Sequence, residues 1–418
     1  MLEIAPIRNL NAAVSAPGSK SYSQRALVIA ALADGKSCLH NTLISEDTCY
    51  LIDGLSALGA KISISGNDVS VTGTEGILKN PSKALFLGNN GTALRFLTSL
   101  VCLGQGSFVL TGDKRLCERP VKPLLDALRT LGVSVSEKNT GYPPVAIVAA
   151  GIEGGIVTLS DIESSQYVSS LLISAPYSRR GVKIRLEGRK VSEPYIDMTL
   201  KVMRDFGVKP EKTADGCCHV KGGQRYVGRE YMIEGDVSSA SYFFLAAALS
   251  GGRIRVLNIN PETIQGDIGI IEIMKDLGCS ARYGANWVEL TGGALHGGEY
   301  MIDMGNMPDM VPGVAVLAAF RQGRTVIKNA SHLRLKESNR LFALATELKR
   351  IGIEAEETKD GLIINGGHPH GAEIETYNDH RIAMSFAIAG LVADGMKIKN
   401  EKCVQKSFPG FWEALKEL

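Results

Sequence analysis

The stretch LIDGLSALGAKISISGNDVSVTG, residues 51–73, decides the fold because its pattern returns four more times along the chain. It reads as an amphipathic helix that ends at a glycine, followed by two short strands joined by a polar turn. Glycine suits the left-handed cap of a helix, and turns rich in Gly, Asn and Asp are typical of hairpins. The equivalent glycines lie 71 to 75 residues apart: Gly59, Gly132, Gly207, Gly278 and Gly352. So regular a spacing predicts an internal repeat.

A further helix and strand precede each copy, so the repeating unit is helix, strand, helix, strand, strand over roughly 70 residues. A sixth unit begins at residues 379–400 (DHRIAMSFAIAGLVADGMKIKN), but the chain stops at Leu418 before a closing hairpin. We expect residues 1–15, which read as strand, turn and strand, to supply that hairpin.

Counting the units then predicts an α/β fold class with two domains of three units each. One domain is continuous, residues 16–230, and the other is split between residues 1–15 and residues 231–418. Only two chain crossings, near residues 15 and 230, would join them, and a hinge would lie there.

Composition excludes several classes of protein. A chain of 418 residues is too long for one ordinary core, and 44% hydrophobic and 22% charged residues are typical of a soluble globular protein. With 46 basic and 44 acidic residues, the net charge of +2 provides no bulk field for nucleic acid. No apolar run approaches the ~20 residues of a membrane span, and no signal peptide is apparent. We therefore expect a cytoplasmic protein.

The eight cysteines show no C-x-x-C spacing, so we expect buried, reduced thiols rather than zinc ligands or disulfides. His368 and His370, in GGHPHG, read as exposed turn residues, and we expect no metal there.

The segment APGSKSYSQRALVIAALADG, residues 16–35, looks like a phosphate-binding loop that leads into a helix. A nucleotide-binding P-loop requires G-x-x-x-x-G-K-[ST], whereas Lys20 here follows Ser19 with no earlier glycine at the required spacing. The segment therefore predicts an anion site that is not a nucleotide P-loop.

Polar runs begin the first helix of every unit, and the helices behind them are apolar enough to be buried. Helix N-termini carry unpaired N–H groups and partial positive charge, so several that converge favour an anion. The alternative is that these polar residues only cap helices. Capping explains neither the arginines just inside three of the starts, Arg25, Arg95 and Arg381, nor the Ser-Ser-Gln cluster at residues 164–166.

More basic residues lie at the ends of elements: Lys20, Arg119, Lys336, Arg340 and Lys406. On a nearly neutral protein this placement indicates recognition of discrete phosphates or carboxylates, although each residue alone could be an ordinary surface cation. We assign Arg334 to that ordinary surface role.

Two carboxylates are candidates for proton transfer: Asp309, in a Met-Pro-Asp turn, and Glu337. The cations Lys336 and Arg340 near Glu337 should keep it ionised, as a base must be. The alternative for Glu337 is a structural ion pair. His380, after Asp379, could be an acid–base group or a phosphate ligand.

The motifs together resemble those of the 5-enolpyruvylshikimate-3-phosphate synthase family of enolpyruvyl transferases. They occur in order between Lys20 and Lys406 and cover nearly the whole chain: PGSKSYSQRA, LGNNGTALR, ERPVKPLLDAL, SSQYVSSLL, KVSEPYIDMTL, EGDVSSASYFFLAAA, NMPDM, LRLKESNRL and YNDHRIAM.

This resemblance implies two domains, each of three βαβαββ units arranged as an inside-out α/β barrel, with the active site in the cleft between them. It implies transfer of the enolpyruvyl group of phosphoenolpyruvate to the 5-hydroxyl of shikimate 3-phosphate, with release of phosphate, in chorismate and aromatic amino acid biosynthesis. The implied partners are these two small molecules, with no metal, no organic cofactor and a monomeric state.

The resemblance also implies the site residues, position by position. Shikimate 3-phosphate would be bound by Lys20, Ser21, Arg25, Ser164, Ser165, Gln166, Ser192, Tyr195, Asp309 and Lys336. Phosphoenolpyruvate would be bound by Lys20, Gly91, Arg95, Arg119, Gln166, Arg340, His380, Arg381 and Lys406. The catalytic residues would be Lys20, Asp309 and Glu337. Glycine at 91 would let the backbone approach a small substrate closely.

Two residues depart from the family pattern. His332 stands where some members carry Asn beside the shikimate phosphate, and Phe96 follows Arg95 where Pro is common. The second could redirect the helix that begins near Gly91, so the response to glyphosate stays open.

Two alternatives remain. The sister family that transfers enolpyruvyl to UDP-N-acetylglucosamine shares the six-unit fold but uses a loop cysteine as proton donor; Cys117 here lies in an ERP context that matches the shikimate family. A non-catalytic repeat scaffold that binds anions is the other, and Asp309 and Glu337 argue against it.

Overall fold

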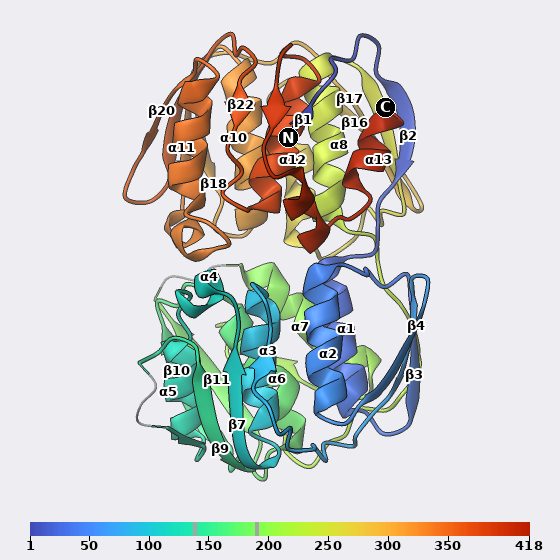
Figure 1. Ribbon diagram of the computed structural model, residues 1–418, viewed down its shortest axis with the longest axis vertical. Coiled ribbons are helices and arrows are strands. Elements are labelled where there is room, and N and C mark those ends of the chain that lie inside the picture. Colours follow the sequence, from blue (N-terminus) through green and yellow to red (C-terminus); the bar gives the residue numbers. More distant parts are fainter. Residues whose placement is uncertain (137–139, 189–191) are drawn as a thin grey trace. The chain divides into compact units, whose positions relative to one another are not determined.

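The computed structural model describes residues 1–136, 140–188 and 192–418, and its chain divides into two units (Figure 1). Unit 1 comprises Met1–Ser19 and Glu234–Leu418, and unit 2 comprises Lys20–Ile233. Each unit has a hydrophobic core of its own. The division lies a few residues beyond the expected positions, and a boundary at 230 would have cut through a strand.

Unit 2 contains three repeats in sequence. Its helices are α1 (Lys20–Leu32), α2 (Glu46–Ala57), α3 (Gly91–Val101), α4 (Lys114–Cys117), α5 (Lys122–Thr130), α6 (Gln166–Ser174) and α7 (Glu193–Asp205), with a 3-10 turn η1 (Ala175–Tyr177). Its strands are β3 (Lys36–His40), β4 (Lys61–Ser65), β5 (Asp68–Thr72), β6 (Leu85–Phe86), β7 (Gln105–Thr111), β8 (Ser134–Val135), β9 (Val145–Ala150), β10 (Gly155–Ser160), β11 (Val182–Glu187), β12 (Glu211–Lys212), β13 (Cys218–Val220) and β14 (Glu230–Met232).

Unit 1 contains the other three repeats. Its helices are α8 (Val237–Ser250), α9 (Ile270–Asp276), α10 (Val311–Phe320), α11 (Arg340–Arg350), α12 (His380–Gly390) and α13 (Phe411–Lys416), with 3-10 turns η2 (Gly266–Gly269), η3 (Pro308–Met310), η4 (Ser331–Leu335) and η5 (Glu401–Lys406). Its strands are β1 (Leu2–Glu3), β2 (Asn11–Ser15), β15 (Arg253–Leu257), β16 (Ser280–Gly284), β17 (Trp287–Thr291), β18 (Tyr300–Asp303), β19 (Gly323–Lys328), β20 (Glu354–Glu357), β21 (Leu362–Gly366), β22 (Glu373–Ile374) and β23 (Lys397–Ile398).

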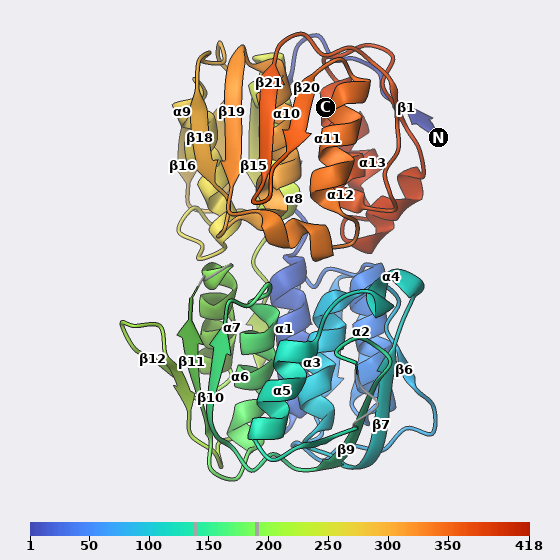
Figure 2. The same ribbon diagram turned by 90° about the vertical axis from the view of Figure 1, so that its left-hand side faces the viewer.

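Within the described residues, five of the six sheets share one topology. The orders are β14-β3-β5-β4, β6-β7-β9-β8, β10-β11-β13-β12, β2-β15-β17-β16 and β18-β19-β21-β20. In each the first two strands are parallel and the other pairs antiparallel, as in the β18–β21 sheet of Figure 2. The sixth sheet has three strands in the order β1-β23-β22.

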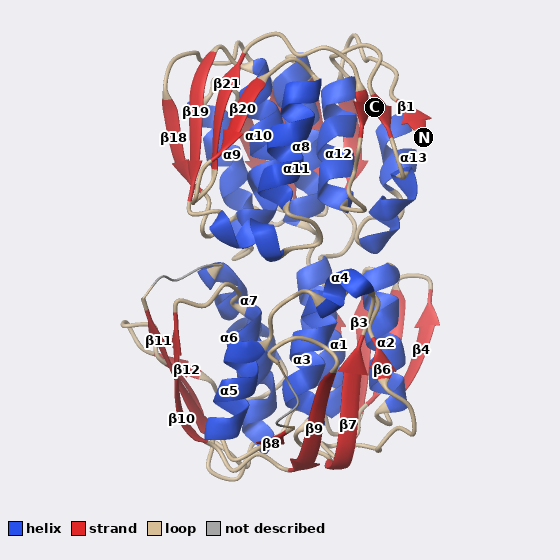
Figure 3. Ribbon diagram, turned by 60° about the vertical axis from the view of Figure 1, so that its left-hand side comes forward, coloured by secondary structure: helices blue, strands red, loops and turns tan. Residues whose placement is uncertain are grey.

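The first helix of each repeat lies inside its unit. Every residue of α12 is buried, as is every residue of α1 from Tyr22 to Leu32. Figure 3 shows these helices within each unit and the sheets along its outside. Helices that are apolar all round must be covered on every side. The predicted α/β class, with helices inside and sheets outside, is therefore confirmed.

The five repeat glycines were predicted to cap helices in the left-handed conformation, and all five do so. Their φ angles are between 85° and 111°. Each directly follows the C-cap residue of the second helix in its repeat, a position where glycine incurs no Cβ penalty.

The prediction that residues 1–15 form the hairpin of the sixth repeat is wrong in part. Strand β1 does pair with β23 of that repeat, antiparallel. Strand β2 instead pairs in parallel with β15 of the fourth repeat. The reason is that β14, which directly precedes the fourth repeat in sequence, pairs with β3 of unit 2. The edge of β15 is thereby left open, and β2, which has the same length, covers it.

No helix within the described residues is long and apolar enough to cross a membrane.

Candidate active site

Arg25 is the centre of the predicted anion site in unit 2. It lies on α1, is 2% exposed, and among the described residues it donates its hydrogen bonds to neutral oxygens. Its Nε lies 2.8 Å from Thr199 Oγ1, and its Nη atoms lie 2.9 Å from the carbonyl oxygen of Ser21 and 3.0 Å from that of Tyr195. Within the described part of the chain no carboxylate forms an ion pair with it. Burial lowers the pKa of Arg25 to about 10, and an anion bound nearby would compensate for that loss of hydration.

The rings of Phe96 and Tyr195 flank the same guanidinium. Its carbon lies 5.4 Å from the centre of the Phe96 ring and 5.8 Å from that of Tyr195. Ring faces attract cations and hold the planar group in place. Phe96, one of the two departures from the family pattern, is thus a wall of the Arg25 site.

Lys20, the first residue of α1, pairs with Asp47 at 3.3 Å. The lysine side chain is 15% exposed and the aspartate 5%. Asn90, the N-cap of α3, fixes this corner, since its side chain donates to the carbonyl oxygen of Asp47 at 2.6 Å and accepts from Ala93 N. The starts of α1 and α3 are therefore connected through Asp47, which pairs with the cation Lys20.

Gly91 begins α3 and makes room for two arginines. A Cβ on Gly91 would lie 2.5 Å from Arg119 Cζ and would collide with Arg95 Nη1. Arg95 donates to the carbonyl oxygens of Gly91 and Pro120 at 2.9 and 3.1 Å, and Arg119 donates to that of Asn89 at 3.3 Å. Both guanidiniums are almost completely buried. Glycine is therefore required at position 91 because the guanidiniums of Arg95 and Arg119 fill the space that a Cβ would occupy.

The Ser-Ser-Gln cluster lies at the start of α6. Gln166 Nε2 donates to Thr92 Oγ1 at 3.0 Å, which connects α6 to α3, and Ser164 Oγ accepts from Gln166 N at 3.3 Å. Ser192 precedes α7 with a φ of 56°, a left-handed conformation that is uncommon for serine. Residues 190 and 191, which begin the KVSEPYIDMTL motif, lie outside the described residues.

In unit 1 the predicted carboxylates surround one arginine. Arg340 begins α11 and is 1% exposed, and its three nitrogens contact three acids. It donates to Asp309 at 3.0 Å, to Glu337 at 2.8 Å and to Asp379 at 2.8 Å. Burial alone lowers the pKa of Arg340, but the charges of Asp379, Glu337 and Asp309 outweigh it and raise the pKa above its ordinary value. The arginine is therefore permanently charged.

Asp309 lies between two arginines. Its Oδ1 accepts from Arg340 and its Oδ2 accepts from Arg381 Nη2 at 2.8 Å. The side chain stays 21% exposed, whereas Arg340 and Arg381 are nearly enclosed. Arg381 also donates to the hydroxyl of Tyr242, whose pKa burial raises to about 12. A partly exposed carboxylate that is held by enclosed cations can accept a proton from a ligand and remain fixed in position.

The other predicted residues of unit 1 lie at the ends of three separate elements. Lys336 directly follows η4 and is half-buried, and Lys406 ends η5 and is 6% exposed. His380 begins α12 and is fully buried, with Nδ1 at 3.7 Å from Asp379 Oδ1. His332, the other departure from the family pattern, is also buried.

Sequence reasoning missed the residues that hold these cations. Thr199 and Ser169 provide neutral hydroxyl acceptors for Arg25, and their two hydroxyl oxygens lie 2.8 Å apart. Asp379 is fully buried and accepts from Arg340, from Ser338 and from Arg381 N. Its position before an apolar helix predicts a cap, which it is, but no local signal indicates that it also binds an arginine from a separate helix.

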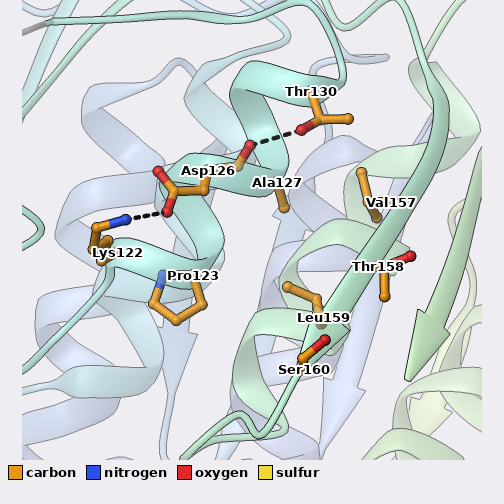
Figure 4. A pocket seen from close by; sticks show the side chains of 9 residues that line it. All are labelled: Lys122, Pro123, Asp126, Ala127, Thr130, Val157, Thr158, Leu159 and Ser160. Atoms are coloured by element: carbon orange, nitrogen blue, oxygen red, sulfur yellow. Dashed lines mark hydrogen bonds and ion pairs between the residues drawn. The ribbon is translucent and has the colours of Figure 1, made fainter. Parts of the chain in front are cut away.

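On the sequence alone, three residues are expected outside the site: Arg334, His368 and His370. Arg334, which we expected to be an ordinary surface cation, is partly exposed and pairs with Glu357. His368 and His370 are exposed, as predicted. A groove of about 350 Å³ between α5 and β10 contains none of the predicted residues (Figure 4); it is lined by Lys122, Pro123, Asp126, Ala127, Thr130, Val157, Thr158, Leu159 and Ser160. Over the described ranges, no group of three or more His, Cys, Asp or Glu is arranged to hold a metal ion.

The two units thus provide different chemistry. Unit 2 presents buried arginines bonded to neutral oxygens, which favours binding of anions. Unit 1 presents carboxylates and cations in direct contact, which favours proton transfer beside a developing negative charge.

The chain is similar to known proteins over nearly its whole length. The model of the EPSP synthase family, described as 3-phosphoshikimate 1-carboxyvinyltransferase, matches residues 4–415. The 3-phosphoshikimate 1-carboxyvinyltransferase of Erwinia tasmaniensis is 42% identical over 100% of this chain and 98% of its own, and that of a Nostoc species is 41% identical over 97% and 96%. The solved EPSP synthase of Acinetobacter baumannii is similar with a TM-score of 0.80 and 28% identity, over 99% of this chain and 97% of that one. The chain therefore belongs to the EPSP synthase family.

Proposed function

We propose that the chain transfers the enolpyruvyl group of phosphoenolpyruvate to the 5-hydroxyl of shikimate 3-phosphate and releases phosphate. This is the 3-phosphoshikimate 1-carboxyvinyltransferase reaction of the shikimate pathway, which leads to chorismate and the aromatic amino acids. The observation that carries the proposal is the contact of Arg340 with Asp309 and Glu337, since it combines proton acceptors with a cation for a departing phosphate.

We assign the two substrates to the residues expected from the sequence. In unit 2, Arg25, Ser164, Ser165, Ser192 and Tyr195 bind shikimate 3-phosphate. The support for this assignment is the buried Arg25 guanidinium, which contacts neutral oxygens and ring faces and so retains its charge for an anion.

Phosphoenolpyruvate uses the remaining cations. Arg95 and Arg119 in unit 2, and Arg340, Arg381 and Lys406 in unit 1, neutralise its phosphate and carboxylate. The set expected for shikimate 3-phosphate also includes Asp309 and Lys336 of unit 1, so both substrates draw residues from both units.

The reaction proceeds by addition and then elimination. Asp309 or Glu337 takes the proton of the 5-hydroxyl, the oxygen attacks C2 of phosphoenolpyruvate, and an acid protonates its methylene carbon. In the tetrahedral intermediate the bond from C2 to the phosphate oxygen then breaks, and loss of a methyl proton restores the enol ether. Lys20 acts in this set as a cation close to the reacting groups, and no metal or organic cofactor is required. We propose that the enzyme acts as a cytoplasmic monomer.

Release of inorganic phosphate from phosphoenolpyruvate tests the proposal, measured with and without shikimate 3-phosphate. The expected result is release that depends strictly on the second substrate, with one enol ether formed per phosphate. Release that depends on UDP-N-acetylglucosamine instead would support the sister activity. Binding of both anions without any release would support a non-catalytic scaffold.

A further inference from the structure

The turn at Thr376–Asp379 has an unusual backbone conformation. Asp379 N donates to the carbonyl oxygen of Thr376 at 2.8 Å, and the two residues between them, Tyr377 and Asn378, both have a φ of 54°. Asparagine tolerates this left-handed conformation, but for a residue as bulky as tyrosine it is an outlier. Such a conformation persists only where the surroundings impose it, and such strain clusters at functional sites.

The side chain of Tyr377 is held by a buried acid. Its hydroxyl donates to Glu347 Oε1 at 2.9 Å, and its ring packs edge-on against Phe342. Glu347 is fully buried on α11, where its other oxygen accepts from Glu375 N at 3.1 Å and from Arg350 Nε at 2.9 Å. Burial and this hydrogen bond raise the pKa of Tyr377 to about 12, so the hydroxyl keeps its proton. Tyr377 therefore connects the turn to α11 through its hydrogen bond to Glu347 and its ring contact with Phe342.

The neighbouring residue fastens the turn to a third element. Asn378 Oδ1 accepts from Asn400 Nδ2 at 3.0 Å. Asn400 is itself left-handed, with a φ of 48°, and directly precedes η5, which ends at Lys406. The turn thus contacts the residue at which η5 begins.

These attachments bring together the elements that carry three cations. Arg340 begins α11, two helical turns before Glu347. Arg381 is the second residue of α12, the helix that Asp379 caps, and Lys406 ends η5. Asp379 binds the Arg340 guanidinium and accepts from the backbone N–H of Arg381, so the turn sets the position of the acid that connects these two residues.

We infer that Tyr377 is a positioning residue for phosphoenolpyruvate: through Glu347 and Asn378 it fixes the relative placement of Arg340, Arg381 and Lys406. This inference rests on the proposed function, because it assumes that these cations bind that substrate. Glycine would adopt the same backbone without strain. A tyrosine is used because its hydroxyl and ring connect the turn to α11.

Steady-state kinetics of Tyr377→Phe tests the inference, since phenylalanine keeps the ring and the backbone and removes only the bond to Glu347. We expect the KM for phosphoenolpyruvate to rise about tenfold, the loss typical of a hydrogen bond to a charged group. The KM for shikimate 3-phosphate should change less than about twofold and kcat less than about threefold, because misplaced cations weaken binding of one substrate.

A second variant separates positioning from stability. Asn378→Gly removes the contact with Asn400 but relieves the backbone, so the melting temperature should stay equal or rise while the KM for phosphoenolpyruvate rises about threefold or more. Tyr300→Phe is the matched control. Its hydroxyl also donates to a carboxylate of unit 1, Asp276 at 3.1 Å, and burial likewise raises its pKa to about 12. Its loss should leave both KM values unchanged.

The outcomes distinguish the inference from the proposed function. Suppose that the wild-type chain is active. If Tyr377→Phe leaves the KM for phosphoenolpyruvate unchanged, or raises the KM values for both substrates by the same factor, the inference alone is overturned. A wild-type chain that forms no product overturns the proposed function and the inference with it.

Discussion

Arg340 Nε lies 2.8 Å from Asp379 Oδ2, and neither side chain is more than 1% exposed. The pair joins the first residue of α11 to the residue that caps α12. Two ions removed from water to this degree are stable only together, because either one alone would retain an uncompensated charge. The start of α11 is thereby locked to the start of the buried helix α12.

Asp379→Asn should lower the free energy of unfolding by about 3 kcal/mol, at the low end for breaking a buried pair because Arg340 keeps two other acids. Urea denaturation measures the loss. Glu299→Gln is the control, since Glu299 is 81% exposed and pairs with the half-exposed Arg324, and such pairs contribute below about 1 kcal/mol. Equal losses in the two variants would contradict the assignment.

Gly91→Ala should raise the KM for phosphoenolpyruvate by about 10- to 100-fold, because the added methyl displaces the guanidiniums of Arg95 and Arg119 from their positions. The KM for shikimate 3-phosphate should change much less. Gly410→Ala is the control, since a Cβ there meets no atom within 4 Å. Steady-state kinetics with each substrate varied in turn provides the test. Equal KM values for phosphoenolpyruvate in Gly91→Ala and Gly410→Ala would contradict the prediction.

Glu337→Gln keeps the size of the side chain and its capacity to accept from Arg340 but removes the base. We expect kcat to fall by about 10²-fold or more, with little change in the affinity for shikimate 3-phosphate. Single-turnover rates and equilibrium binding provide the two measurements. A parallel loss of rate and affinity would instead assign Glu337 to the structural ion pair with Arg340.

Asp267 provides a test by pH. Burial, followed by repulsion from Asp309, raises the pKa of Asp267 from its ordinary value of 3.8 to about 7. Because the folded chain then binds a proton that the unfolded chain releases, stability is lost as the pH rises from about 4 to about 7. Asp267→Asn does not titrate and avoids that loss.

The stability of Asp267→Asn relative to the wild type should therefore increase across this window. At ~1.4 kcal/mol for each pKa unit, the change approaches about 4 kcal/mol as an upper bound. Urea unfolding at about pH 4 and about pH 8 measures it. A difference that is constant with pH would show that Asp267 is ionised in the folded chain.

The sequence predicted what depends on local rules. The five repeat glycines are identified by spacing and by helix capping, and Arg334 and His368 by their surroundings in the sequence. The residues that hold the cations could not be found in this way. Thr199 is an ordinary residue of an amphipathic helix, and its contact with Arg25 joins positions 174 residues apart.

Strand pairing was the other limit. Strand β2 reads as a short alternating strand whichever sheet receives it. Its place beside β15 is available only because β14 is used elsewhere, which is a property of the whole topology. The conformation of Tyr377 is also beyond local prediction, because a tyrosine with a positive φ contradicts its own preference and is imposed by Glu347.

The exchange of β2 and β14 sets an order of events during synthesis. Once residue 233 has left the ribosome, every strand of the three sheets of unit 2 is available, β14 included. Strand β2 was made much earlier, yet its neighbour β15 begins only at Arg253, and the partner of β1 is made last of all. Domains generally fold as units while the chain emerges. The segment that contains β1 and β2 therefore stays unpaired until unit 2 has folded and its own partner strands have been made.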